Sequence, residues 1–497
     1  MEKPKYILIH PADNVAVALQ PIAQGETICC RQKAINLLED IPAGHKVALE
    51  TIRKGENVIK YGCPIGHATA EIAPGQRIDE RNLKTNLAGI VDYQYCPAAA
   101  TGAPASVSRT FKGFVRRNGD VGIRNELWII PTVGCVNGVA QELARRMNEE
   151  THGAGTDGIV AFTHNYGCSQ LGDDHENTRR ILRAMALHPN AGGVLVVGLG
   201  CENNQPEGFM ASLGDYDRQR VRLLVCQKET DEISRGMEML REIHAAMNGD
   251  ERTDVPAGKL KVGLKCGGSD GLSGITANPL LGRFSDCLVA QGGTAVLTEV
   301  PEMFGAETLL MNRCKDEATF RKTVALINDF KRYFLDHHQP IAENPSPGNK
   351  AGGISTLEEK SLGCVQKSGS TAVCDVLEYG GRLVSTGLNL LSAPGNDLVA
   401  ATALAASGCQ MVLFTTGRGT PFGTFVPTVK ISSNTGLAQR KTGWIDFNAG
   451  VLAEGEPMPQ VLSRFADFVT AVASGQQTLN EQQGYRDIAI FKSGITL

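Results

Sequence analysis

"GVLVVGLGC" (193–201) decides the fold class, because a β-rich apolar run ends there on a Gly-Cys step. Two upstream runs end in the same way, "WIIPTVGC" at Cys135 and "GIVAFTHNYGC" at Cys168. The two intervals are equal, since 168 − 135 = 33 and 201 − 168 = 33. Each interval holds one strand and one helix, and a helical pattern such as 138–150 follows the apolar run. The sequence therefore predicts an α/β fold with βαβ units on a mainly parallel sheet.

Cysteines at strand ends are the first candidates for chemistry. In an open parallel sheet, ligands bind beyond the carboxyl ends of the strands, where Cys135, Cys168 and Cys201 are expected. Cys266 ends a fourth such run, "LKVGLKC". Converging thiolates suit iron, and the Cys-x-x-Cys pairs typical of structural zinc are absent from the sequence. We expect these cysteines to hold iron, with Cys266 as the reserve ligand. The pattern leaves open whether the iron is a single ion or a cluster, and whether the Gly-Cys steps are only tight turns.

The chain divides into four parts that differ in composition and in expected secondary structure. Residues 1–95 contain short β-leaning runs separated by glycine turns, which predicts a small β-rich domain. An Ala-, Pro- and Ser-rich linker is expected over 96–110. Strands and helices alternate over 111–266, which predicts an α/β domain with cysteines at its strand ends. A second, glycine-rich α/β region is expected over 267–497.

Composition excludes several classes of protein. The 497 residues carry a formal net charge of −4 without basic patches, which disfavours a nucleic-acid partner. No apolar run reaches the ~18–20 residues that cross a bilayer, and no secretory signal is recognisable, so a cytoplasmic protein without a membrane partner is expected. The fourteen cysteines are widely spaced, unlike a disulfide framework. A homo-oligomer, by default a dimer, is the expected assembly.

Glycine-rich loops supply candidates for binding an anion. The loop 266–279 offers backbone N–H groups and matches no dinucleotide fingerprint or P-loop. Further loops over 344–353 and 415–421 present cations, which suit a carboxylate such as that of a sugar acid. Two histidines, His45 and His164, are candidates for proton transfer. The expected substrate-binding residues are Arg124, Asn125, Ser269, Asp270, Lys350 and Arg418.

Several long strings resemble one known family along the whole chain. Among them are "GHKVAL", "VIKYG", "YGCSQLGDDH", "GLGCENNQ", "CGGSDGLSGITANP", "TEVPEMFGAE", "NPSPGNKAGG" and "TTGRGTP". They are similar to the altronate/galactarate dehydratase family. The resemblance implies an N-terminal domain of the SAF type, an α/β catalytic region, a requirement for ferrous iron and a sugar-acid substrate. It also implies dehydration of D-altronate to 2-dehydro-3-deoxy-D-gluconate, a step of hexuronate catabolism.

Loss of water from an aldonate sets the requirements of the site. The weakly acidic C2 proton needs a base, and the C3 hydroxyl needs an acid or a metal to leave. We expect His45 and His164 to act as base and acid. Activity on galactarate or sulfolactate is the alternative within the same chemistry, and a non-catalytic sugar-acid binding protein is the alternative outside it.

Overall fold

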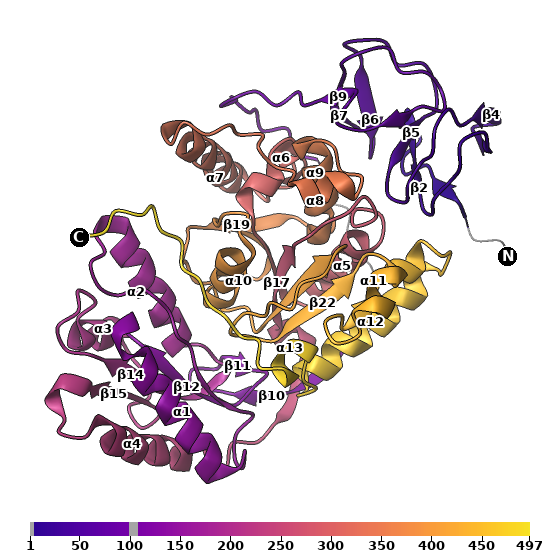
Figure 1. Ribbon diagram of the computed structural model, residues 1–497. Coiled ribbons are helices and arrows are strands. Elements are labelled where there is room, and N and C mark those ends of the chain that lie inside the picture. Colours follow the sequence, from indigo (N-terminus) through magenta and orange to yellow (C-terminus); the bar gives the residue numbers. More distant parts are fainter. Residues whose placement is uncertain (1–3, 99–107) are drawn as a thin grey trace.

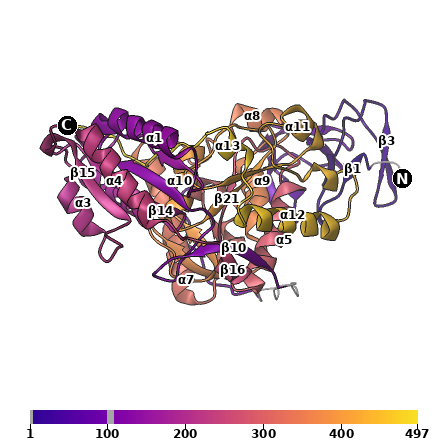
Figure 2. The same cartoon turned by 90° about the horizontal axis from the view of Figure 1, so that it is seen from below.

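The computed structural model describes residues 4–98 and 108–497. The predicted linker falls partly outside the described residues, over 99–107. Figure 2 shows an elongated molecule, with the N-terminal strands at one end and the second region of the chain at the other. The sheet of that second region has four strands. A larger sheet lies between these two parts, so the molecule places two separate sets of strand ends along its length (Figures 1 and 2).

The N-terminal region is β-rich, as predicted. Its strands form a four-stranded antiparallel sheet in the order β1-β2-β5-β8, a hairpin β3-β4 and a three-stranded sheet β6-β7-β9. The glycine turns between the strands let these short elements fold back on each other and bury isoleucine and valine side chains. The strands are β1 (Tyr6–Ile7), β2 (Val15–Ala18), β3 (Thr27–Cys30), β4 (Lys33–Asn36), β5 (Lys46–Ala48), β6 (Asn57–Lys60), β7 (Cys63–Ala68), β8 (Arg77–Ile78) and β9 (Leu83–Lys84).

The second region contains the three runs that end in Gly-Cys, and they form parallel strands of one sheet, as predicted. The strand order is β13-β12-β14-β15. Helices α1 and α4 pack on one face, and α2 and α3 lie on the other. The elements are β12 (Glu126–Pro131), α1 (Asn137–Thr151), β13 (Ile159–Ala161), α2 (Gly172–Ala186), β14 (Ala191–Gly198), α3 (Pro206–Ser212), β15 (Val221–Val225) and α4 (Glu232–Ala246).

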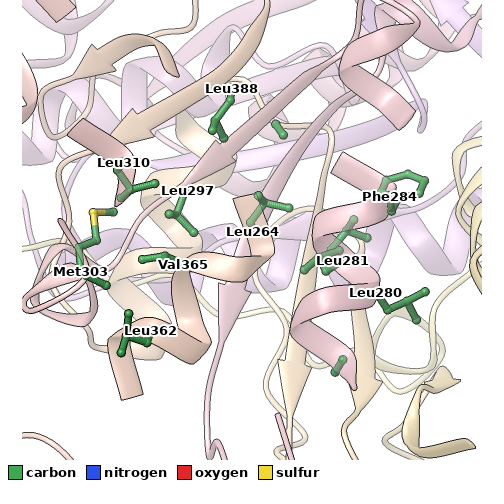
Figure 3. Close-up of a cluster of buried hydrophobic side chains, with 14 of the residues drawn as sticks. Leu264, Leu280, Leu281, Phe284, Leu297, Met303, Leu310, Leu362, Val365 and Leu388 are labelled. Carbon is green, nitrogen blue, oxygen red and sulfur yellow. The ribbon is translucent and has the colours of Figure 1, made fainter. Parts of the chain in front are cut away.

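The third region is built on a seven-stranded sheet in the order β19-β20-β18-β17-β21-β22-β23, with every pair parallel. Leu264, Leu297 and Leu388, from three neighbouring strands, share one core with Phe284 of α5 and Leu362 of α9 (Figure 3). Its elements include β17 (Lys261–Cys266), α5 (Ala277–Ala290), β18 (Thr294–Leu297), α7 (Glu317–Asp336), α8 (Pro347–Ala351), α9 (Leu357–Cys364), β19 (Val373–Leu377), β20 (Gly387–Leu391), α10 (Asp397–Ala406), β21 (Met411–Thr416), β22 (Thr428–Ser432), β23 (Phe447–Asn448) and α12 (Met458–Ala473).

Cys266 requires a correction to the expected arrangement. It ends β17, whose neighbours are β18 and β21 of the seven-stranded sheet, whereas Cys135, Cys168 and Cys201 follow strands of the four-stranded sheet. Helix α10 packs between the two sheets in a shared apolar core. Cys266 therefore does not join the other three thiols.

Smaller elements tie the regions together. Strands β10 (Thr110–Val115), β11 (Val121–Gly122) and β16 (Thr253–Pro256) form an antiparallel sheet in the order β11-β10-β16. This sheet pairs residues that precede the second region in the sequence with residues that follow it. The C-terminal tail returns to α2, where Ser493 and Gly494 donate backbone hydrogen bonds to the carboxylate of Asp174 (Figure 1). Within the two described stretches, no helix combines the length and the apolar character needed to cross a membrane.

Candidate functional site

The seam is the contact between the N-terminal domain and the third region, formed by 44–46 and 60–61 on one side and by 267–274 and 349–364 on the other. Glycines allow the two backbones to touch there. A Cβ atom on Gly271 would lie 2.0 Å from the carbonyl oxygen of Gly44, and one on Gly353 would lie 2.4 Å from the same oxygen. The domains therefore meet through an intimate backbone contact that a side chain would block.

A buried ion pair crosses the seam. The carboxylate of Glu359, on α9, accepts hydrogen bonds from Lys46 Nζ at 2.8 Å and from Lys60 Nζ at 2.7 Å. All three side chains are at most 1% exposed. Burial opposes ionisation of Glu359, but Lys46 and Lys60 lower its pKa to about 2. The seam thus depends on one carboxylate that neutralises two ammonium groups.

Beside this ion pair lies a group of possible metal ligands. Glu302 Oε2 lies 3.2 Å from the Sγ atoms of Cys266 and Cys364, which are 3.4 Å apart. Across 4–98 and 108–497, this is the only group of three or more His, Cys, Asp or Glu side chains whose donor atoms all lie within 4.8 Å of one another. Two soft sulfur donors and one carboxylate oxygen, all buried, form a possible metal site.

Lysines surround the sulfur atoms and set their charge. The hydrogen bond from Cys364 lowers the pKa of the Cys266 thiol to about 6, and Lys367, whose Nζ lies 2.7 Å from that sulfur, acts in the same direction. Burial alone would raise the pKa of Glu302, but Lys360 at 2.8 Å helps to lower it to about 2. The group therefore holds a thiolate and a carboxylate at neutral pH.

Two hollows open beside these charges. One is a cavity of about 390 Å³ lined by residues that include Gln20 and Ala43 of the N-terminal domain and Asp270 and Arg418 of the third region. The other is a narrow pocket whose lining includes Lys60, Ser269, Lys360 and Cys364. Asp270 lines both, so the cavity and the narrow pocket lie next to each other.

Six of the expected site residues lie at or beside the seam: Cys266, described above, and His45, Ser269, Asp270, Lys350 and Arg418. His45 Nε2 lies 3.4 Å from the carbonyl oxygen of Ala351, and burial lowers the pKa of this histidine. Among the atoms described, neither His45 Nδ1 nor the buried Ser269 Oγ has a hydrogen-bond partner. Arg418 donates to Gly348 O at 3.2 Å, and Lys350 lies on the neighbouring α8. Ser269 and Arg418 line the hollows, whereas His45 and Lys350 lie close in sequence to Ala43 and Gly352, which line the cavity.

Asp270 has a different part in the seam. Its Oδ1 accepts hydrogen bonds from Ser273 N, Ser273 Oγ and Ser433 Oγ, and its Oδ2 accepts one from Asn434. These bonds hold the loop after β17 against the loop after β22. Asp270 therefore shapes the wall of the cavity.

Three expected metal ligands form a second group, the thiol rim: Cys135, Cys168 and Cys201. All three are exposed at the carboxyl ends of neighbouring strands. His164 lies beside the rim, where its Nε2 contacts Pro131 O at 2.8 Å and its Nδ1 accepts a hydrogen bond from Tyr166 N at 3.1 Å. Both ring nitrogens are engaged, and His164 is not at the seam, so the structure does not bring it together with His45.

Arg124 and Asn125 lie at neither place. They directly precede β12, at the edge of the sheet opposite the thiol rim. Arg124 is 2% exposed and pairs with Glu481 at 2.8 Å. Asn125 Oδ1 accepts a hydrogen bond from Arg116. Their polar groups stabilise packing between distant segments, so the expected contact with substrate is not supported.

Sequence reasoning missed most of the buried charges. Lys46 and Lys60 stand inside apolar strand patterns, where a lysine is unusual and signals a buried partner. Cys364 ends a further Gly-Cys step, but on a helix, so a search of strand ends overlooks it. No local pattern distinguishes Glu302 or Glu359 from surface glutamates.

Comparisons with known proteins cover the whole chain. Three family models match: "Altronate/galactarate dehydratase SAF domain" over 4–86, "D-galactarate dehydratase/Altronate hydrolase, second domain" over 113–248 and "D-galactarate/Altronate dehydratase, C-terminal" over 257–496. The chain is 58% identical to altronate dehydratase of Escherichia coli (strain K12), over 99% of this chain and 100% of that protein. It is also 58% identical to altronate dehydratase of Bacillus subtilis (strain 168), over 99% of both. Identity to galactarate dehydratase (L-threo-forming) of Escherichia coli is 35%, over 98% of this chain and 96% of that protein.

Proposed function

Since the chain belongs to the altronate/galactarate dehydratase family and is therefore a sugar-acid hydro-lyase, we propose that it converts D-altronate to 2-dehydro-3-deoxy-D-gluconate and water at the seam. The observation that carries the proposal is the gathering of unpaired polar groups, cations and a buried thiolate–carboxylate group at the seam, where a cavity and a narrow pocket open. Altronate is preferred to galactarate because identity to the two altronate dehydratases is 58% and identity to the galactarate dehydratase is 35%.

Substrate binding follows from the cations near the cavity. Arg418, which lines the cavity, and Lys350 of the adjacent α8 attract the carboxylate of the sugar acid, and the guanidinium can bind it through two hydrogen bonds. The Ser269 hydroxyl is buried and unpaired within the described part of the chain, so a substrate hydroxyl would satisfy it. These contacts orient C2 and C3 toward the buried end of the seam.

Proton transfer is assigned to His45. Burial lowers the pKa of its imidazole, so the ring is neutral near pH 7 and can take the C2 proton at Nδ1. The ammonium groups of Lys60 and Lys360, which line the narrow pocket, stabilise the negative charge that develops as this proton leaves. One of these ammonium groups supplies the proton with which the C3 hydroxyl departs as water.

Ferrous iron is the metal we propose for the seam, with Cys266, Glu302 and Cys364 as its ligands. The donor set fits, because two sulfur atoms and a carboxylate oxygen lie within 4.8 Å of one another and suit a borderline-soft divalent ion. When bound, such an ion acts as a Lewis acid toward the oxygen atoms of the substrate. Lys367 now contacts Cys266 Sγ, so its ammonium group must move aside for the ion.

A panel of sugar acids tests the proposed reaction. Purified protein, prepared anaerobically with Fe²⁺, should release a 2-keto-3-deoxy acid from D-altronate with a higher kcat/KM than from galactarate. Sulfolactate should give no sulfite above background. Turnover confined to galactarate or sulfolactate, or binding of sugar acids without turnover, would contradict the proposal.

Removing the metal or its sulfur ligands should abolish dehydration. Cys266→Ser and Cys364→Ser are expected to lose seam iron and altronate turnover together, because oxygen donors hold Fe²⁺ less tightly than thiolates do. Cys287→Ser, which changes a partly buried thiol of α5, is the matched control and should keep both. Elemental analysis and a keto-acid assay provide the two readouts. Full activity in Cys266→Ser, or in chelated wild type, would refute the ligand assignment.

We also propose the cytoplasm as the compartment, because iron binding requires the thiols to stay reduced. A homodimer remains the proposed assembly, and sedimentation measures it directly.

A further inference from the structure

We infer that the thiol rim binds an iron–sulfur cluster, at a site separate from the seam. The inference stands independently of the proposed reaction, since it uses only Cys135, Cys168 and Cys201 and the loops that carry them. The chemical class of the cofactor follows from the number, spacing and exposure of these thiols.

Strand register shows that the three cysteines follow neighbouring strands at similar distances along the chain. Pro131 pairs with Val197, and Cys135 and Cys201 each follow their member of that pair by four residues (135 − 131 and 201 − 197). Ile129 pairs with Ala161, and Cys135 and Cys168 follow them by six and seven residues (135 − 129 and 168 − 161). Neighbouring strands lie about 4.8 Å apart. The three loops therefore leave one edge of the sheet from neighbouring strands and reach their cysteines after similar numbers of residues.

Hydrogen bonds fasten the three loops to one another. Gly134 N donates to Tyr166 O at 2.9 Å, which joins the first loop to the second. Asn204 N donates to Gly167 O at 3.0 Å, which joins the third loop to the second. On its outer side, the second loop is held by the C-terminal tail, where Leu497 N donates to Ser169 O. Backbone hydrogen bonds thus join all three loops of the rim into one scaffold.

Glycines permit this close assembly. A Cβ atom on Gly167 would lie 2.0 Å from the carbonyl oxygen of Thr132, so only glycine fits before Cys168. Gly200 has a φ of +127°, which L side chains rarely adopt, directly before Cys201. The repeated Gly-Cys step is therefore a requirement of the way the loops present their thiols.

Packing does not explain the thiols themselves. Cys135, Cys168 and Cys201 are exposed, whereas cysteine used as a small hydrophobe is among the most buried residues. Their polar contacts are weak: Gln227 Nε2 lies 3.5 Å from Cys201 Sγ, and Ser169 Oγ lies 4.0 Å from Cys168 Sγ. Three accessible sulfur atoms on a rigid rim are arranged to bind a thiophilic group.

The spacing of the rim thiols argues against a single ion bound by all three. With metal–sulfur bonds of about 2.3 Å, tetrahedral ligation of one ion brings sulfur atoms to about 3.8 Å from each other. The rim sulfur atoms are not all within 4.8 Å of one another, a spacing met only by the seam group in the described chain. A cluster holds each thiolate on a different iron atom and spans a wider ring.

Three thiolates would leave one iron of a four-iron cluster without a protein sulfur. The next candidate, Cys226, follows β15, but burial raises the pKa of its thiol to about 11 and it packs against the core beside α4. It is therefore poorly suited to complete the set. The open iron would face solvent, because all three rim thiols are exposed.

Anaerobic purification of the full chain tests the inference. Iron and acid-labile sulfide are measured, together with visible absorption and electron paramagnetic resonance after reduction. Cys135→Ser, Cys168→Ser and Cys201→Ser should each lose most of the labile sulfide and the visible band. Cys29→Ser, which changes an exposed thiol of the N-terminal domain, is the matched control and should keep both.

The outcomes separate the rim from the seam. Circular dichroism and elution volume identify any variant that fails to fold. A triple variant, with serine at Cys135, Cys168 and Cys201, is compared with a triple alanine variant, so that a folding defect of one can be recognised from the other. Absence of labile sulfide after both anaerobic purification and reconstitution, unchanged sulfide in the triple variant, or one bound ion without sulfide would each overturn the cluster. Altronate turnover is assayed in parallel. A protein that binds the cluster but does not turn over altronate refutes only the proposed reaction. A protein that turns over altronate but binds no cluster refutes only the inference about the thiol rim.

Discussion

Replacing Glu359 with glutamine is expected to lower the free energy of unfolding by about 3–5 kcal/mol, the usual cost of breaking a buried ion pair from one side. The substitution keeps the shape of the side chain but leaves Lys46 and Lys60 as unneutralised charges in a dry seam. Urea denaturation measures the loss. In limited proteolysis, the N-terminal domain should be cleaved earlier in Glu359→Gln than in wild type, because the ion pair joins this domain to α9.

Two further variants isolate the charge effect. Glu317→Gln removes an exposed partner of Arg321 on α7 and should change stability by less than about 1 kcal/mol. Adding Lys46→Met to Glu359→Gln should recover part of the loss, because one of the two unpaired ammonium groups is removed. Equal stability of Glu359→Gln and Glu317→Gln would show that the seam pair does not hold the domains.

The same pair predicts a dependence on pH. The pKa of Glu359 is lowered to about 2, below the ordinary glutamate value of about 4.3. A lowered pKa means that the stabilisation is complete above the unfolded value and is lost as the pH falls toward 2. Wild type should therefore lose more stability than Glu359→Gln between about pH 4.3 and pH 2.

Removing the imidazole of His45 should have the largest effect on catalysis. His45→Ala is expected to lower kcat by about 10²–10⁴-fold, the usual contribution of a general base. The fold should tolerate the change, since Nδ1 has no partner in the described part of the chain and Nε2 has one long contact at 3.4 Å. Steady-state kinetics on D-altronate measures kcat and KM separately.

The pH profile distinguishes a base from a structural histidine. Burial and the nearby charge of Lys46 lower the pKa of His45 below about 6.5, so wild-type kcat/KM should fall only when the pH drops below that lowered value. The acidic limb should vanish in His45→Gln. His337→Gln, on the exposed end of α7, should keep the wild-type profile. Wild-type kcat in His45→Ala would exclude the role.

Local sequence patterns determined the fold class and part of the seam. The alternation of apolar strands and amphipathic helices predicted parallel sheets correctly, because periodicity depends on neighbours a few residues apart. Glycine-rich loops indicated Ser269, Lys350 and Arg418, because binding residues concentrate on loops held by a scaffold. The family itself could be identified from long strings of residues spread along the chain.

Long-range packing decided the rest. A Gly-Cys step follows β12, β13 and β14 of one sheet, and another, at Cys364, ends a helix of the third region. Only the pairing of the strands shows which of these thiols lie at the same edge of a sheet. Glu302 and Glu359 resemble surface glutamates in sequence but neutralise buried lysines that are distant along the chain. From the sequence, Arg124 was expected to bind substrate, but in the folded chain its guanidinium pairs with Glu481. Sequence determined which residues could do chemistry, whereas the tertiary structure decided their partners, since charge pairing and burial depend on contacts that no short pattern encodes.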